Sequence, residues 1–221
     1  MMTTLAVLVA LAGAQGPDRF VSTFEVDTAN LVTHGKNDYF ILEPEFRLIL
    51  EGPTEKVSIT VLEKTKMVDG VKTRVVEERE FENGELKEVS YNYYAFDKKT
   101  KNVYYFGEDV DMYEDGKVVR HEGAWLSGID RARFGLMMPG APKIGYLFYQ
   151  ESAPGKALDR GEIVSLNDML ETPAGKFTDC LKVLETSGMD LNERGYKVYA
   201  KGIGMIQDED MTLRWHGYID D

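Results

Sequence analysis

The segment YFGEDVDMYEDGKVVRHEGAW, Tyr105–Trp125, shows most directly which kind of fold the chain adopts. Its centre is Asp115-Gly116, a pair that favours the two-residue turn of a β-hairpin, because both turn positions need positive φ. Apolar and polar residues alternate on either side of this pair, as they do in strands that bury one face. The segment is therefore predicted to form a β-hairpin.

The same pattern recurs along the chain. Asp69-Gly70 and Asn83-Gly84 are further two-residue turns between β-branched or aromatic residues. The run KVSITV at Lys56–Val61 alternates with period two, and no long stretch has helical periodicity. About ten short strands with regular turns predict an all-β fold with little helix, either a single antiparallel β-barrel or a β-sandwich.

Length and composition indicate one domain. The chain has 221 residues, of which 43% are hydrophobic, and no Pro-, Gly- or Ser-rich linker divides it. A single β domain is expected over residues 18–221. The net charge of −12 argues against nucleic acid as a partner, because phosphates need a basic face. It also argues against an anionic membrane surface, and it favours a protein that attracts cations.

The N-terminal residues resemble a secretory signal peptide. Leu5–Leu11 is an unbroken apolar run, and Ala12-Gly13-Ala14 then supplies the small residues of a cleavage site, so residues 1–14 are predicted to be removed. The run is too short for stable insertion in a bilayer. The protein is expected to be exported, periplasmic or extracellular, and soluble; a buried N-terminal strand or helix is the alternative. Cys180 has no partner for a disulfide and is predicted to be a buried thiol.

The Asp115-Gly116 turn fixes an expected register in which the numbers of facing residues add up to 231. Asp111 then faces Arg120, which pairs opposite charges, and Val110 faces His121. Most carboxylates fall on a face directed to water, but Glu108 falls on the apolar face. That face holds Phe106, Glu108, Val110, Met112, Val119, His121, Gly123 and Trp125.

Glu108 is the leading candidate for a functional residue. It lies diagonal to both His121 and Trp125, and a buried carboxylate is costly unless it is paired. A Glu–His pair suits acid–base chemistry or metal ligation, although a buried structural hydrogen bond is the alternative. The candidate catalytic residues are Glu108, His121, Glu151 and Asp159. The candidate ligand-binding residues are Tyr105, Phe106, Glu108, His121, Trp125 and Tyr149, with Tyr93 and Phe148 as further apolar surface. The candidate metal ligands are Glu108, Asp109, Glu122 and Glu151.

Several motifs together resemble a group of exported bacterial proteins of uncharacterised function. They include YYFGED at Tyr104–Asp109, EGAW at Glu122–Trp125, QESAPGKALD at Gln150–Asp159 and TPAGKFTDCL at Thr172–Leu181. The resemblance covers most of the chain after residue 14, and it implies no activity. The group often has acidic residues where this chain has Ser90 and Asn92.

Four functions remain open at this point. The first is a small-ligand-binding protein with an aromatic and acidic pocket. The second is a divalent-cation site for calcium or manganese. The third is a hydrolase or lyase that uses carboxylates and His on an extracellular polymer. The fourth is a structural or interaction domain. Of these, small-ligand binding is the prediction.

Overall fold

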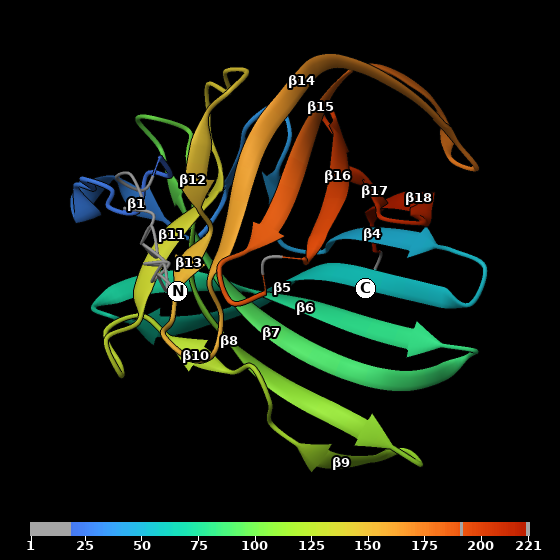
Figure 1. Ribbon diagram of the computed structural model, residues 1–221, viewed down its shortest axis with the longest axis horizontal. Coiled ribbons are helices and arrows are strands. Elements are labelled where there is room, and N and C mark those ends of the chain that lie inside the picture. The colour runs from blue at the N-terminus through green and yellow to red at the C-terminus, as the bar shows by residue number, and fades with distance from the viewer. Residues whose placement is uncertain (1–18, 191, 220–221) are drawn as a thin grey trace, which may run out of the picture.

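The computed structural model describes residues 19–190 and 192–219. In that part of the chain, sixteen strands join in one sheet and two form a separate ribbon. The sheet is antiparallel and curls into a nearly closed barrel (Figure 1), which confirms the predicted all-β class. It has more strands than the ten expected, because several are interrupted or very short. The predicted signal peptide, residues 1–14, lies outside the described residues.

The secondary-structure elements have the following bounds. They are η1 (Thr28–Asn30), β1 (Leu31–Val32), β2 (Gly35–Lys36), β3 (Ile41–Leu42), β4 (Phe46–Glu51), β5 (Glu55–Val68), β6 (Val71–Glu82), β7 (Glu85–Asp97), β8 (Val103–Glu114), β9 (Lys117–Arg120), β10 (Trp125–Leu126), β11 (Arg133–Met138), β12 (Leu147–Tyr149), β13 (Glu151–Ser152), β14 (Asp159–Thr172), β15 (Gly175–Ser187), β16 (Arg194–Ala200), β17 (Gly204–Asp208) and β18 (Met211–Tyr218).

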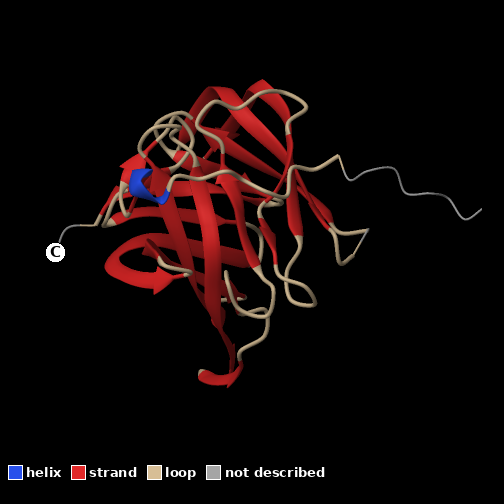
Figure 2. Cartoon of the chain, turned by 90° about the vertical axis from the view of Figure 1, so that its left-hand side faces the viewer, coloured by secondary structure: helices blue, strands red, loops and turns tan. Residues whose placement is uncertain are grey.

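Helix is limited to η1 in the described residues, the short blue element of Figure 2. Asp27 caps it by accepting a hydrogen bond from the Ala29 N–H at 3.1 Å. Within residues 19–190 and 192–219, no helix has the length and apolar character that crossing a membrane requires.

The predicted two-residue turns are confirmed. Val68 pairs with Val71 across Asp69-Gly70, and φ is 49° at Asp69 and 75° at Gly70. Positive φ at both positions is the type I′ geometry, whose twist matches that of the flanking strands. Asn83-Gly84 and Asp115-Gly116 have the same geometry.

One short segment closes the barrel. Strand β12 pairs with β14, and β13 pairs with β11, so the two ends of the strand order β12-β14-β15-β16-β17-β18-β4-β5-β6-β7-β8-β11-β13 are adjacent in sequence. Gln150 lies between β12 and β13, and its N–H donates to the Asp159 carbonyl at 2.8 Å. The chain bends at Gln150 and hydrogen-bonds to one edge of the sheet on each side of the bend.

The register of the predicted hairpin is only partly correct. Glu114 pairs with Lys117 and Tyr113 with Val118, as expected. The register then slips, so that Met112 pairs with Arg120, and Trp125 pairs with Glu108 instead of Phe106. All four residues of β9 are exposed, and so no buried side chain fixes the pairing there.

A β-bulge at Gly107 changes which side chains of β8 share a face. The pairs Asn92–Glu108 and Tyr94–Tyr105 are separated by two residues on β7 but by three on β8, which is a β-bulge. Gly107 has φ 142°, and an added Cβ would lie 2.4 Å from the Trp125 carbonyl oxygen. The bulge directs both Tyr105 and Glu108 toward the barrel interior, so the expectation that Phe106 and Glu108 share a face is wrong.

We predict that Gly107→Ala lowers the free energy of unfolding by about 3–5 kcal/mol, because it adds a backbone clash to an unfavourable φ. Gly84→Ala is the matched control: its φ is also positive, but no atom lies near its added Cβ, so about 1 kcal/mol is expected. Urea denaturation of both variants measures the difference. Equal losses would show that the bulge does not depend on glycine.

Candidate functional site

The barrel interior holds a cavity of about 360 Å³ that is partly open to solvent. This volume lies within the range of small-molecule sites. One wall is apolar and belongs mainly to β4, β5, β17 and the loops next to them. It is formed by Tyr39, Phe40, Ile41, Phe46, Leu48, Ile59, Val61, Val76, Ile203 and Met205.

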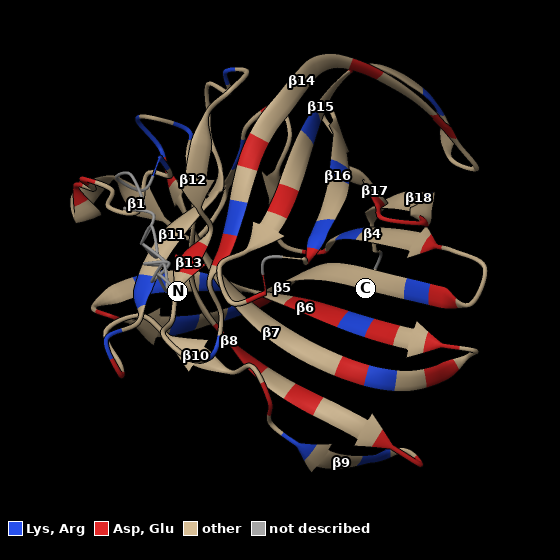
Figure 3. Ribbon diagram, in the orientation of Figure 1, with Lys and Arg blue, Asp and Glu red and all other residues tan. Residues whose placement is uncertain are grey.

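The opposite wall is acidic. Seven carboxyl groups line the cavity and only one basic side chain, Lys197, does so. The carboxyl groups belong to Glu78, Glu80, Glu88, Glu108, Glu151, Asp159 and Glu185. Acidic residues recur along β6, β7 and β8 and again on β14 and β15 in Figure 3.

The lining of the cavity changes from apolar to acidic along a row of residues that pair across neighbouring strands. Leu48 pairs with Ile59, Ile59 with Glu78, and Glu78 with Ser90, so a single row across β4–β7 passes from aliphatic to charged. Glu80 and Glu88 are direct partners in the sheet, an arrangement of like charges that is unfavourable without a counter-ion. The interior is thus divided into an apolar half and an acidic half.

Lys197 neutralises only part of this charge. Its ammonium lies 3.0 Å from Glu185 and 3.5 Å from Asp208. Burial alone would lower the pKa of Lys197, but these two carboxylates raise it well above its usual range. Within the described residues, no ion pair joins Glu78, Glu88 or Glu108 to a basic side chain.

The carboxyl groups without an ion pair have raised pKa values. Burial raises the pKa of Glu78 from 4.5 to about 8, against the attraction of Lys197. Burial raises the pKa of Glu108 and of Glu88 to about 7, and each gains further from a neighbouring carboxylate. Near neutral pH this wall holds both protonated and ionised groups. It can therefore donate protons or accept a cation.

Two tyrosines with buried rings have hydroxyl groups without a hydrogen-bond partner in the described part of the protein. Tyr94 and Tyr199 are 4% and 5% exposed, and both line the cavity. Neither hydroxyl makes a hydrogen bond to any residue that the structure describes. By contrast, the Tyr105 hydroxyl donates to the Asn92 side-chain oxygen at 2.6 Å. The Tyr94 and Tyr199 hydroxyl oxygens are accessible from the cavity and are not sealed in the core, so water or a ligand can supply the missing partner.

The structure brings four predicted site residues to this cavity: Tyr105, Glu108, Glu151 and Asp159. Glu151 is 2% exposed, and its carboxylate accepts a hydrogen bond from the Asp159 N–H. Burial, together with the charge of Asp159, raises the pKa of Glu151 well above its usual range.

The predicted aromatic residues are buried, but Phe106, Trp125 and Tyr149 do not line the cavity. Trp125 packs edge-on against Tyr105 with ring centroids 5.2 Å apart, and so it supports the wall from behind. Phe106 stacks on Phe134 at 4.7 Å. Phe148 packs on Tyr146. Cys180 is fully buried, as predicted.

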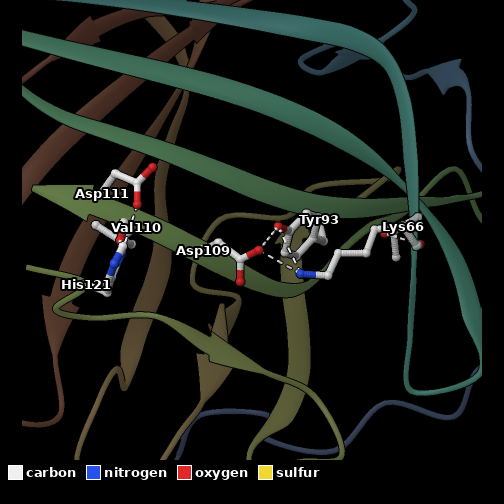
Figure 4. Close-up of polar contacts among 7 residues, drawn as sticks. Lys66, Tyr93, Asp109, Val110, Asp111 and His121 are labelled. Carbon is white, nitrogen blue, oxygen red and sulfur yellow. Dashed lines mark hydrogen bonds and ion pairs between the residues drawn. The ribbon is translucent and has the colours of Figure 1, made fainter. Parts of the chain in front are cut away.

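His121 and Asp109 lie on the outer side of β8 (Figure 4). The His121 side chain is 70% exposed, and its Nδ1 lies 2.8 Å from an Asp111 carboxylate oxygen. The predicted Glu108–His121 pair therefore does not form, because the register slip moves His121 to the other face. Asp109 accepts hydrogen bonds from Lys66 at 2.7 Å and from the Tyr93 hydroxyl at 2.5 Å.

The four candidate metal ligands do not converge. Glu108 and Glu151 line the cavity, whereas Asp109 is bound to Lys66, and the Glu122 side chain is 75% exposed. Across residues 19–190 and 192–219, no group of three or more His, Cys, Asp or Glu side chains is placed to hold a metal ion.

Sequence reasoning missed Glu78, Glu88, Glu185 and Lys197. In β6, Val76, Glu78 and Glu80 alternate on one face, a pattern usually taken for a strand end directed to water. For Glu78 the sequence does carry a signal: it lies two residues after the apolar Val76 and so on the same strand face. Ser90 and Asn92 also line the cavity.

No known family model, curated protein or solved structure matches the chain.

We predict that Glu78→Gln stabilises the protein at high pH. A carboxyl group whose pKa rises from 4.5 to about 8 on folding holds its proton more tightly in the folded state. Its contribution to stability is therefore lost as pH rises between those values. Gln cannot ionise, so the variant should gain about 1–3 kcal/mol of unfolding free energy at pH 8.5 and little at pH 4.5.

Urea denaturation at both pH values measures this difference. Glu122→Gln on the exposed hairpin is the matched control and should change stability by less than about 0.5 kcal/mol. A Glu78→Gln variant that is less stable at pH 8.5 would show that the Glu78 carboxylate is satisfied as an ion.

Proposed function

We propose that the protein binds a small ligand inside the barrel, between its apolar and acidic walls. The supporting observation is the cavity of about 360 Å³, which Tyr94 and Tyr199 line with hydroxyls that have no partner among the described residues. A ligand with a polar group could complete these hydrogen bonds. Export remains a proposal from the N-terminal sequence.

Ligand binding explains the features of the cavity better than a purely structural role does. A barrel selected for stability would fill its interior with aliphatic side chains, since small barrels normally have packed cores. Here the interior keeps open volume, paired like charges at Glu80 and Glu88, and carboxyl groups with raised pKa. These features lower stability and favour a ligand that offsets them.

Filling the cavity provides the test. Ile59→Trp places a large side chain on the apolar wall, and Val119→Trp, on the exposed strand β9, is the matched control. The probe is a neutral naphthalene dye, 6-propionyl-2-dimethylaminonaphthalene, whose fluorescence rises in apolar surroundings. The parent and Val119→Trp are expected to bind one dye per chain, and Ile59→Trp is expected to bind at least tenfold more weakly.

Two results would contradict the proposal. The first is the absence of saturable dye binding to the parent chain. The second is equal binding by Ile59→Trp and the parent, which would place the dye on the surface. Thermal melting of each variant shows whether Ile59→Trp is folded, since a folded variant is needed for the comparison.

A further inference from the structure

We propose that the ligand of this cavity is an organic cation, an amine or ammonium group attached to an apolar body. This inference rests on the proposed function and adds the chemical class of the ligand. It depends on the unequal distribution of charge and apolar surface within one site.

The charge of the cavity selects against anions. Seven carboxyl groups face it, and its one lysine is already held by Glu185 and Asp208. A carboxylate or phosphate ligand would enter a site with many like charges and no free basic side chain among the described lining residues. An ammonium group placed near Glu78 and Glu108 would instead favour their ionised forms.

The apolar wall would contact the apolar body of the ligand. Leu48 and Ile59 lie in the same cross-strand row as Glu78, so a ligand of modest length contacts both kinds of surface at once. A simple inorganic cation would leave the apolar wall in contact with water. The rings of Tyr94 and Tyr105, which stack with centroids 4.9 Å apart, add further apolar surface to the lining.

The acidic character continues beyond the cavity. A second depression of about 220 Å³ shares Asp159, Glu185 and Lys197 with it and adds the charged residues Glu193, Arg194, Asp208 and Glu209. The depression therefore adjoins the cavity, and its lining has five carboxyl groups and two basic side chains. Together with the net charge of −12, it would raise the local concentration of cations at the site.

The test compares three naphthalene compounds of similar size by isothermal titration calorimetry with the full chain at pH 8.5. They are 2-(1-naphthyl)ethylammonium, 2-(1-naphthyl)ethanol and 3-(1-naphthyl)propanoate. The ammonium compound is expected to bind at least tenfold more tightly than the alcohol, and the propanoate more weakly than both. The double variant Glu78→Gln/Glu108→Gln should reduce the preference for ammonium over alcohol to less than threefold, and Glu122→Gln should leave it unchanged.

The outcomes separate this inference from the function on which it rests. Saturable binding of the alcohol with no preference for the ammonium compound would overturn the inference and leave ligand binding intact. Tighter binding of the propanoate would do the same. A preference that persists in a folded double variant would place the cation elsewhere on the acidic surface and would also overturn the inference. No saturable binding of any of the three compounds would overturn both proposals.

Discussion

The barrel depends on the bend at Gln150, where six consecutive residues, Leu147–Ser152, pair with both ends of the sheet. Without this segment the strands would form a curved sheet with two open edges, and the interior face would be in contact with water. Closure instead encloses that face. Gln150 also links the closing segment to the acidic wall, because its side-chain amide donates to Glu185 at 2.6 Å.

Enclosure gives the interior carboxyl groups their unusual properties. Glu78, Glu88 and Glu108 lie on adjacent strands, where on an open sheet water would solvate them fully. Inside the barrel, solvation is reduced and Lys197 is engaged by Glu185 and Asp208. Raised pKa values follow from this geometry, because the cavity is a poor environment for the charges of its own carboxyl groups. A bound cation with an apolar body would improve both the electrostatics and the packing.

The sequence predicts local structure well and the site only in part. Turn pairs such as Asp69-Gly70 determine their geometry through backbone φ alone, so the hairpins could be predicted. The bulge at Gly107 depends on contact with Trp125, and no short-range pattern indicates it. The bulge places Glu108 in the lining of the cavity, which also includes Glu151. The register slip leaves His121 outside the cavity. Glu151 and Asp159 were chosen for their chemistry, whereas Glu78 was missed because alternation alone does not show whether a polar strand face lines a cavity or faces bulk solvent.

Carbon-13 NMR titration of the glutamate side-chain carboxyl groups tests the central claim most directly. Glu78, Glu88 and Glu108 would each be assigned by loss of a signal in its Glu→Gln variant. In the ligand-free protein these three signals are predicted to titrate near pH 7 to 8, far above the ordinary pKa of a glutamate. If all glutamates titrate near their ordinary pKa of about 4.3, the interior is fully solvated, and the account of the acidic cavity is contradicted.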